Sequence, residues 1–197
     1  MQPSFVHLHT HSHYSLLDGL SKVPDLVKRA KKFGMPALAL TDHGNLHGAI
    51  EFYKACKKEG IKPIIGVEAY VANRTRFDKE PGVDNKRFHL TLLATNNTGY
   101  KNLIKLVTAS HLEGYYYKPR IDKDLLKEHH DGLIALSGCM GGQLSRAIEH
   151  GNKERAEEVA REYIERRLVK PLFCMASRST LRKICFDIKR YVRAARH

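Results

Sequence analysis

Apolar and polar positions follow two alternating patterns along the chain. Apolar residues at three- and four-residue steps predict helices. Short, continuous apolar runs are typical of strands that are buried on both faces of a sheet. Together the patterns predict strands over 6–10, 37–41, 62–72, 88–94 and 133–136, and helices over 21–33, 47–59, 99–111, 123–130, 141–150 and 153–165.

The segments between these elements are polar and rich in turn-forming residues. Residues 73–86 are predicted to form a loop, and residues 112–122 are predicted to be irregular. Strands that alternate with helices predict βα units, and therefore a parallel sheet of the α/β class. Reactive groups in such folds lie just beyond the carboxyl ends of the strands.

Four histidines stand within seven residues near the start of the chain, in V-H-L-H-T-H-S-H-Y-S-L-L-D-G. Because side chains alternate along an extended chain, His7, His9, His11 and His13 are expected on one face. Imidazole and carboxylate are ligands that zinc, manganese and iron prefer. A solvated edge strand with scattered histidines is the alternative, so the metal hypothesis requires further ligands from other strands.

Further side chains of this kind follow at or near the other predicted strands. They are Asp18 after the first strand, His43 after the second, Glu68 and His89 in or near the third and fourth, and Cys139 after the fifth. Two divalent ions a few ångströms apart can bind a phosphate between them and lower the pKa of bound water from about 15.7 to about 7. We therefore expect hydrolysis of a phosphate ester by metal-bound water, without a Ser or Cys nucleophile. Glu68 or Asp18 would bridge two ions, and Cys139 would favour zinc or iron over magnesium.

Six blocks in this order and spacing carry a family resemblance: H-L-H-T-H-S-H-Y-S-L-L-D-G, T-D-H-G-N, I-K-P-I-I-G-V-E-A-Y, F-H-L-T-L-L-A, G-Y-Y-Y-K-P-R-I-D and I-A-L-S-G-C. From about Phe5 to about Ile164 the chain resembles the PHP (polymerase and histidinol phosphatase) domain. More narrowly, it resembles the PHP domain at the N-terminus of bacterial DNA polymerase III alpha subunits.

The resemblance implies a distorted, TIM-like (β/α)7 barrel with a trinuclear metal centre. The ligand positions of the family fall on His9, His11, Asp18, His43, Glu68, His89 and Cys139. Two or three divalent ions are implied, with zinc, manganese or iron as candidates. Where these positions are intact, the family is linked to 3′–5′ exonuclease proofreading on single-stranded DNA ends within the replicative holoenzyme.

Two other functions remain open beside the metal-dependent exonuclease. Some members of the family have a degenerate site and serve as noncatalytic scaffolds. A stand-alone phosphatase for a small phosphomonoester is the third reading, although the T-D-H-G-N and G-Y-Y-Y-K-P-R-I-D blocks favour the polymerase branch. In the second of these blocks, Lys118 and Arg120 are candidate substrate-binding residues, because cations and aromatic rings suit a single DNA strand. Aromatic packing under a loop is the alternative there.

The net charge of +13 is unevenly distributed. Ten of the 34 Lys and Arg residues, but only one of the 21 acidic residues, fall in residues 166–197. The high pI therefore does not describe the first 165 residues. We expect a partial PHP domain over 1–165 and a basic tail over 166–197 that has no family resemblance and is out-of-frame or follows a truncation. Nonspecific nucleic-acid binding by the tail is the alternative.

The tail replaces the segment that would complete the family fold. Two further family ligands, an aspartate and a histidine in a segment like N-D-x-H-Y, are not found, and neither are the polymerase parts. We therefore expect a barrel that is incomplete at its C-terminal end, with an unpaired edge strand.

Sequence composition indicates the cellular compartment of the protein. No apolar run approaches the roughly 20 residues of a membrane span, and the first residues lack a signal-peptide pattern. The cysteines, Cys56, Cys139, Cys174 and Cys185, form no CxxC pair. We expect a cytoplasmic protein with reduced thiols and no membrane partner.

Overall fold

The structure is a computed structural model that describes residues 5–16 and 18–165. The predicted basic tail, 166–197, lies outside the described residues. The elements are α1 (Val23–Lys32), β1 (Ala37–Leu40), α2 (Ala49–Glu59), β2 (Lys62–Ala72), β3 (Arg87–Ala94), α3 (Asn97–Leu112), β4 (Tyr115–Tyr116), β5 (Lys118–Ile121), α4 (Lys123–Glu128), β6 (Leu133–Leu136), α5 (Gln143–Glu149) and α6 (Lys153–Glu165). None of the described helices combines the length and the apolar character that crossing a membrane requires.

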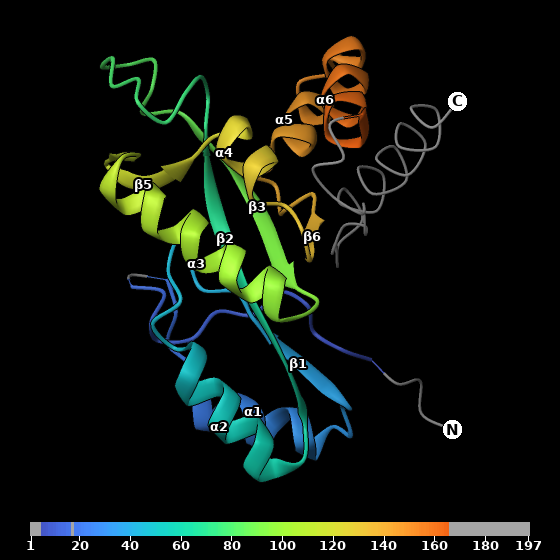
Figure 1. The fold of residues 1–197 in the computed structure, drawn as a ribbon. Coiled ribbons are helices and arrows are strands. Elements are labelled where there is room, and N and C mark those ends of the chain that lie inside the picture. Colours follow the sequence, from blue (N-terminus) through green and yellow to red (C-terminus); the bar gives the residue numbers. More distant parts are fainter. Residues whose placement is uncertain (1–4, 17, 166–197) are drawn as a thin grey trace.

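The long strand β2 is the axis of the sheet (Figure 1). Its first four residues pair with β1 in parallel, and Tyr70 and Val71 pair with β5 in parallel. On the opposite edge, β3 pairs with β2 in the antiparallel sense from Gly66 to Ala72, and β6 continues antiparallel to β3. The sheet is therefore mixed, and the predicted parallel sheet is wrong.

The reversal of direction follows from the connection between β2 and β3. Parallel neighbours need a crossover, usually through a helix. Residues 73–86 contain no helix and form the predicted loop. The chain therefore reverses after β2, and β3 pairs beside β2 in the antiparallel sense. The six described strands form an open α/β sheet, and the expected (β/α)7 barrel is not confirmed.

The two faces of the sheet differ in what covers them. Residues directly opposite each other on antiparallel strands point to the same face. Val67, Ala69 and Val71 of β2, with Leu90 and Leu92 of β3, therefore share the face that packs against α3 and α4. The other face carries Glu68 and Tyr70 of β2 and His89 of β3, above a small apolar cluster around Ala39, Leu93 and Leu136. The candidate site thus lies on the face that α3 does not cover.

The first predicted strand is absent, although its backbone lies beside β1. Ala39 N donates to His7 O at 2.9 Å, and Thr41 N donates to Thr10 O at 2.9 Å. The acceptors His7 and Thr10 are three residues apart, while the donors Ala39 and Thr41 are two residues apart. The N-terminal segment therefore has one more residue than β1 between the two hydrogen bonds. The chain bends at residues 8 and 9 to accommodate it, as at a β-bulge. The prediction of a regular strand over 6–10 is therefore wrong.

The segment predicted to be irregular, 112–122, contains the hairpin β4–β5 instead. Tyr116 pairs with Lys118, so Tyr117 alone forms the turn. Such a turn needs a positive φ, and Tyr117 supplies it with φ of 59°. Since glycine and asparagine are the usual residues there, the three tyrosines gave no turn signal in the sequence.

Arg120 of β5 anchors the 73–86 loop. Its side chain is fully buried, and its guanidinium donates to four backbone carbonyls: those of Gly114 (3.0 Å), Asp84 (2.9 Å), Arg76 (3.1 Å) and Asp78 (2.9 Å). These donors face the backbone of the protein rather than solvent. Arg120 is therefore not available to a substrate, and its predicted role as a substrate contact is wrong.

The role of Arg120 as an anchor predicts a large loss of stability on substitution. Arg120→Met would leave four carbonyls without this donor, two of them buried and two partly buried, and we expect the free energy of unfolding to fall by about 3 kcal/mol. Urea denaturation followed by circular dichroism measures this change. Arg29→Met, at an exposed position on α1, serves as the control and is expected to change stability by less than about 0.5 kcal/mol. Equal effects of the two substitutions would contradict the anchoring role.

Candidate metal centre

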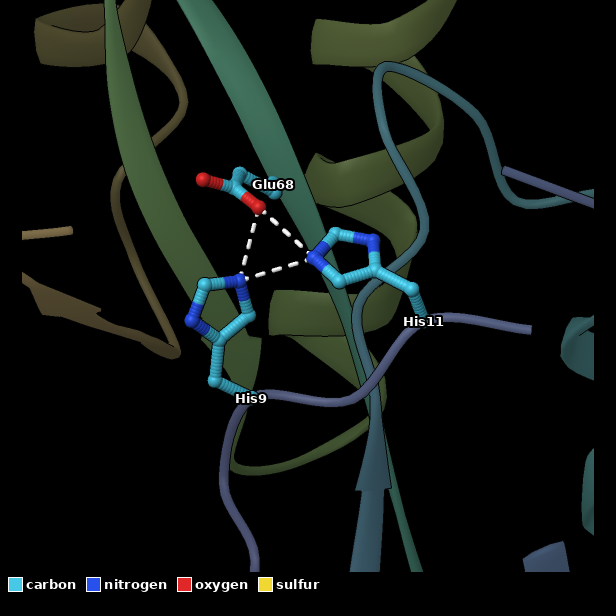
Figure 2. A group of neighbouring side chains, drawn as sticks. All are labelled: His9, His11 and Glu68. Atoms are coloured by element: carbon cyan, nitrogen blue, oxygen red, sulfur yellow. Dashed lines mark hydrogen bonds and ion pairs between the residues drawn. The ribbon is translucent and has the colours of Figure 1, made fainter. Parts of the chain in front are cut away.

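Glu68 of β2 lies at the centre of a cluster of imidazole rings. Its Oε2 is 2.7 Å from His9 Nε2 and 2.8 Å from His11 Nε2. The two nitrogens are 2.9 Å apart, so the three atoms form a nearly equilateral triangle (Figure 2). Figure 2 shows that both rings approach the carboxylate from the N-terminal segment, on the same side of the strand that carries Glu68.

The other oxygen of Glu68 faces a second group of side chains. Its Oε1 is 2.8 Å from His89 Nδ1 and 3.7 Å from Cys139 Sγ, and the latter two atoms are 3.6 Å apart. His43 contacts both groups, since its ring centre is 4.3 Å from that of His11 and 5.2 Å from that of His89. Its Nδ1 is 3.6 Å from Glu68 Oε2, and its Nε2, 2.7 Å from Asp18 Oδ2, brings Asp18 to the cluster.

All seven residues predicted as ligands therefore gather at one place. Among the described residues, three sets of side chains offer ligand atoms within 4.8 Å of one another: His9, His11 and Glu68; His11, Asp18 and His43; and His43, Glu68 and His89. Cys139 is exposed at the edge of this group. The assignment of each residue as a metal ligand stays a prediction, but the convergence expected from the sequence is present.

His7 and His13 lie outside the cluster, so the prediction that all four histidines share a face is wrong. His7 is exposed and packs against Phe5, while the His13 ring packs on Tyr14 with 4.3 Å between ring centres. The bend at residues 8 and 9 separates His7 from His9 and His11, and a turn begins at His13, so the alternation on which the prediction rested is broken on both sides. His9 and His11 alone of the four face Glu68.

The rings control the charge of Glu68. Burial alone would raise the pKa of this carboxyl, but hydrogen bonds from His11, His89 and His9 outweigh burial and hold its pKa far below the usual range. Contacts with Cys139 and Glu68 raise the pKa of His89 to about 9, whereas burial lowers the pKa of His43. A buried and permanently ionised carboxylate is a strong attractor for cations.

These residues fit divalent metal ions. The donors are imidazole nitrogens, carboxylate oxygens and one thiol, which together are typical of zinc, manganese and iron sites. His43 Nδ1 is buried without a hydrogen-bond partner in the described part of the chain, and an unpaired buried nitrogen is unfavourable unless something binds it. His9 Nε2 and His11 Nε2 face each other at hydrogen-bond distance, where at most one can donate.

The turn that carries His43 is fixed to β2 and to the β4–β5 hairpin. Glu68 N donates to Asp42 O at 3.1 Å, and Gly44 N donates to Glu68 O at 3.0 Å. Gly44 has φ of +61°, and a Cβ there would lie 2.8 Å from Cγ of Pro119. Glycine is therefore required for both the backbone conformation and the close approach, which places His43 beside Glu68.

The loop that carries Asp18 closes on itself in a similar way. Gly19 N donates to Ser15 O at 2.8 Å, and His13 N donates to Ser21 O at 2.9 Å. A Cβ on Gly19 would lie 1.8 Å from Ser12 O, so no larger residue fits. This close approach turns the chain back toward His43 and brings Asp18 to it.

Sequence reasoning missed the hydroxyl that supports the ligands. Ser15 Oγ is 2.9 Å from His11 Nδ1, accepts from His43 N at 2.9 Å and donates to Asp42 Oδ1 at 3.1 Å. Asp42 is buried and also accepts from the backbone N and the hydroxyl of Ser12. The adjacent D-H of T-D-H-G-N was a signal for Asp42, but nothing in the sequence marked Ser15.

These contacts determine how His11 is protonated. A serine hydroxyl has one proton and two lone pairs. Since Ser15 donates its proton to Asp42 and accepts from His43 N, its remaining lone pair must accept from His11 Nδ1–H. When the His11 ring is neutral, its lone pair is therefore on Nε2 and directed toward Glu68, so that a metal ion can replace the proton through which the protonated ring binds Glu68.

Removal of the Ser15 hydroxyl is therefore expected to weaken metal binding. For Ser15→Ala we expect about 10- to 100-fold lower affinity for Zn²⁺ or Mn²⁺, as for other residues that orient metal-ligating histidines. Titration with a competing chelator measures the affinity. Ser137→Ala is the matched control, since Ser137 Oγ is buried but makes no hydrogen bond within the described residues. Unchanged affinity in Ser15→Ala would show that Ser15 does not orient His11.

Comparison with known proteins identifies the family. The family model described as the PHP domain matches residues 7–168, and the chain belongs to this family.

Similar proteins include alpha subunits of bacterial DNA polymerase III. The chain is 55% identical over 161 residues to DNA polymerase III subunit alpha of Treponema pallidum, which covers 81% of this chain and 14% of that protein. With DNA polymerase III subunit alpha of Borreliella burgdorferi it shares 57% identity over 145 residues, or 73% of this chain and 13% of that protein. The chain thus spans only about one seventh of the length of these relatives.

The likeness to solved structures is weaker. A protein described as a metal-dependent phosphoesterase from Bifidobacterium adolescentis has a TM-score of 0.40 and 20% identity, over 55% of this chain and 34% of its own. An amidohydrolase from Chromobacterium violaceum has a TM-score of 0.40 and 25% identity, over 53% of this chain and 32% of its own. At this level of likeness, neither structure supports a conclusion about the function of this chain.

Proposed function

We propose that this chain is the metal-dependent phosphodiesterase domain of a replicative DNA polymerase III alpha subunit, with 3′–5′ exonuclease activity on single-stranded DNA ends. The observation that supports it most is that Glu68 and six other ligand-type side chains gather in one cluster. Two or three divalent ions, of zinc, manganese or iron, are the proposed cofactors. DNA and the remainder of the polymerase holoenzyme in the cytoplasm are the proposed partners.

The division of the chain near residue 165 into a PHP domain and an unrelated basic tail also stays a prediction.

The ions would supply Lewis acidity and an activated water for attack on a phosphate ester. Glu68 offers its two oxygens to the two sides of the cluster and stays ionised while buried. Ser15 and Asp42 hold His11 in the tautomer that keeps its Nε2 lone pair free. Lys118, whose Nζ lies 5.8 Å from the centre of the Tyr70 ring, is positioned to neutralise a substrate phosphate.

Metal content and hydrolysis together test the proposal. Purified residues 1–197 are expected to carry two or three ions per chain by mass spectrometry, and to release mononucleotides from the 3′ end of a 5′-labelled single-stranded oligonucleotide. His9→Ala and His43→Ala are each expected to lose metal and at least about 100-fold of the activity. His150→Ala, an exposed histidine at the end of α5, is the control and should change neither.

Each alternative function predicts a different result. Faster hydrolysis of p-nitrophenyl phosphate than of the oligonucleotide would favour a phosphatase for small phosphomonoesters. Bound metal without hydrolysis of either substrate, or no bound metal, would favour a scaffold and contradict the proposed activity.

A further inference from the structure

The turn between β4 and β5 holds a tyrosine in a conformation that tyrosine rarely adopts. Tyr117 is the only residue other than glycine with a positive φ in the ranges 5–16 and 18–165. This conformation brings the Cβ of an L-residue too close to the backbone, which glycine avoids and asparagine tolerates better. The Tyr117 side chain is nevertheless 66% exposed, so its own burial does not offset the strain. An exposed ring on a strained backbone is typical of a functional site.

The hairpin that carries Tyr117 is fixed to the metal centre. Pro119, two residues on, packs so closely against Gly44 that no Cβ fits between them. His111, near the end of α3, donates through Nε2 to Gly44 O at 2.9 Å. Since Gly44 follows the candidate ligand His43, the position of Tyr117 is set relative to the cluster.

Two cations, one of them in the hairpin itself, lie beside the Tyr70 ring. Lys118 Nζ is 5.8 Å and Arg87 Cζ is 5.6 Å from the centre of the Tyr70 ring. The Tyr70 ring in turn packs on His43 and His89, at 5.5 Å and 5.3 Å between ring centres. In the part of the chain that the structure describes, neither cation forms an ion pair with a carboxylate. Two positive charges that no carboxylate of the described residues neutralises therefore lie beside Tyr70, the ring that packs on the candidate ligands His43 and His89.

We propose that Tyr117, Lys118 and Arg87 form a subsite for single-stranded nucleic acid. The Tyr117 ring stacks on a base, and the two cations contact the phosphates between that base and the metal centre. Cations that follow the backbone and exposed aromatic rings that stack on bases are the shared features of single-strand binding. The subsite rests on the proposed function, since it assigns the substrate strand to the same centre. A small phosphomonoester has no second nucleotide to reach the Tyr117 ring.

The backbone of Tyr117 allows a variant that separates binding from folding. Asparagine tolerates a positive φ, so Tyr117→Asn removes the ring while keeping the turn, and its thermal midpoint should equal or exceed that of the wild type. Tyr117→Phe keeps the stacking surface. Tyr53→Asn is the matched control, because Tyr53 is also exposed but lies on α2 at the opposite end of the sheet (Figure 1). Every variant retains residues 166–197, so any contribution of the basic tail is the same in all.

Binding is measured without metal, by fluorescence anisotropy of a labelled twelve-residue oligo-dT in EDTA. We expect about tenfold weaker binding for Tyr117→Asn, the change that loss of one base–aromatic stack produces. Tyr117→Phe and Tyr53→Asn should stay within about twofold of the wild type. Lys118→Gln and Arg87→Gln should each reduce the slope of log affinity against log salt by about one.

Photocrosslinking locates the contact directly. Oligo-dT that contains 5-iododeoxyuridine should crosslink to the peptide with Tyr117, as identified by mass spectrometry, and the crosslink should be lost in Tyr117→Asn.

The failures of the two proposals are distinguishable. Unchanged binding by Tyr117→Asn and crosslinks only elsewhere would overturn the subsite, even if the oligonucleotide is hydrolysed when metal is added. Weakened binding with the Tyr117 crosslink would support the subsite, even if no hydrolysis is found and the proposed activity fails.

Discussion

The structure depends on one unfavourable placement, a carboxylate buried in the middle of the sheet. Glu68 is almost completely buried, and burial alone would protonate it. Imidazoles from the N-terminal segment and from β3 bind it and reverse that tendency, so the carboxylate remains charged, and His43 from the turn after β1 lies 3.6 Å from the same carboxylate. The N-terminal segment, the turn after β1 and the strand β3 are thereby held together by polar contacts, whereas the opposite face of the sheet packs against α3 and α4 through apolar side chains.

The sequence predicted the positions of most elements and little of how they are arranged. The strand predicted over 62–72 is β2 (Lys62–Ala72), and the helix predicted over 47–59 is α2 (Ala49–Glu59). These elements follow from the local spacing of apolar residues. Strand direction does not follow from local spacing. The apolar pattern of β3 predicts a buried strand whether it runs parallel or antiparallel to β2. Only the connection before it, which contains no helix, determines that it runs antiparallel.

The candidate site was predictable to the extent that residue type reveals chemistry. Histidine and glutamate at strand ends are recognisable as potential ligands, and all seven predicted side chains meet in the structure. Ser15 was not predictable, because serine is common in loops and two of its three partners, Asp42 and the backbone N of His43, are distant in sequence. Ser15 was a missed residue, whereas Arg120 was assigned a role that the structure contradicts. Its charge suggested a substrate contact, while its four carbonyl acceptors come from a loop whose path the sequence does not specify.

The bend at residues 8 and 9 has a consequence for how the N-terminal segment can vary. One extra residue between the hydrogen bonds of His7 and Thr10 to β1 sets which side chains face Glu68. A deletion of one residue there would restore regular pairing and rotate one half of the segment away from the cluster, even with every histidine kept. The spacing of this segment is thus as restrictive as its composition, and a homologue with the same histidines at a different spacing would need a different backbone path to place them.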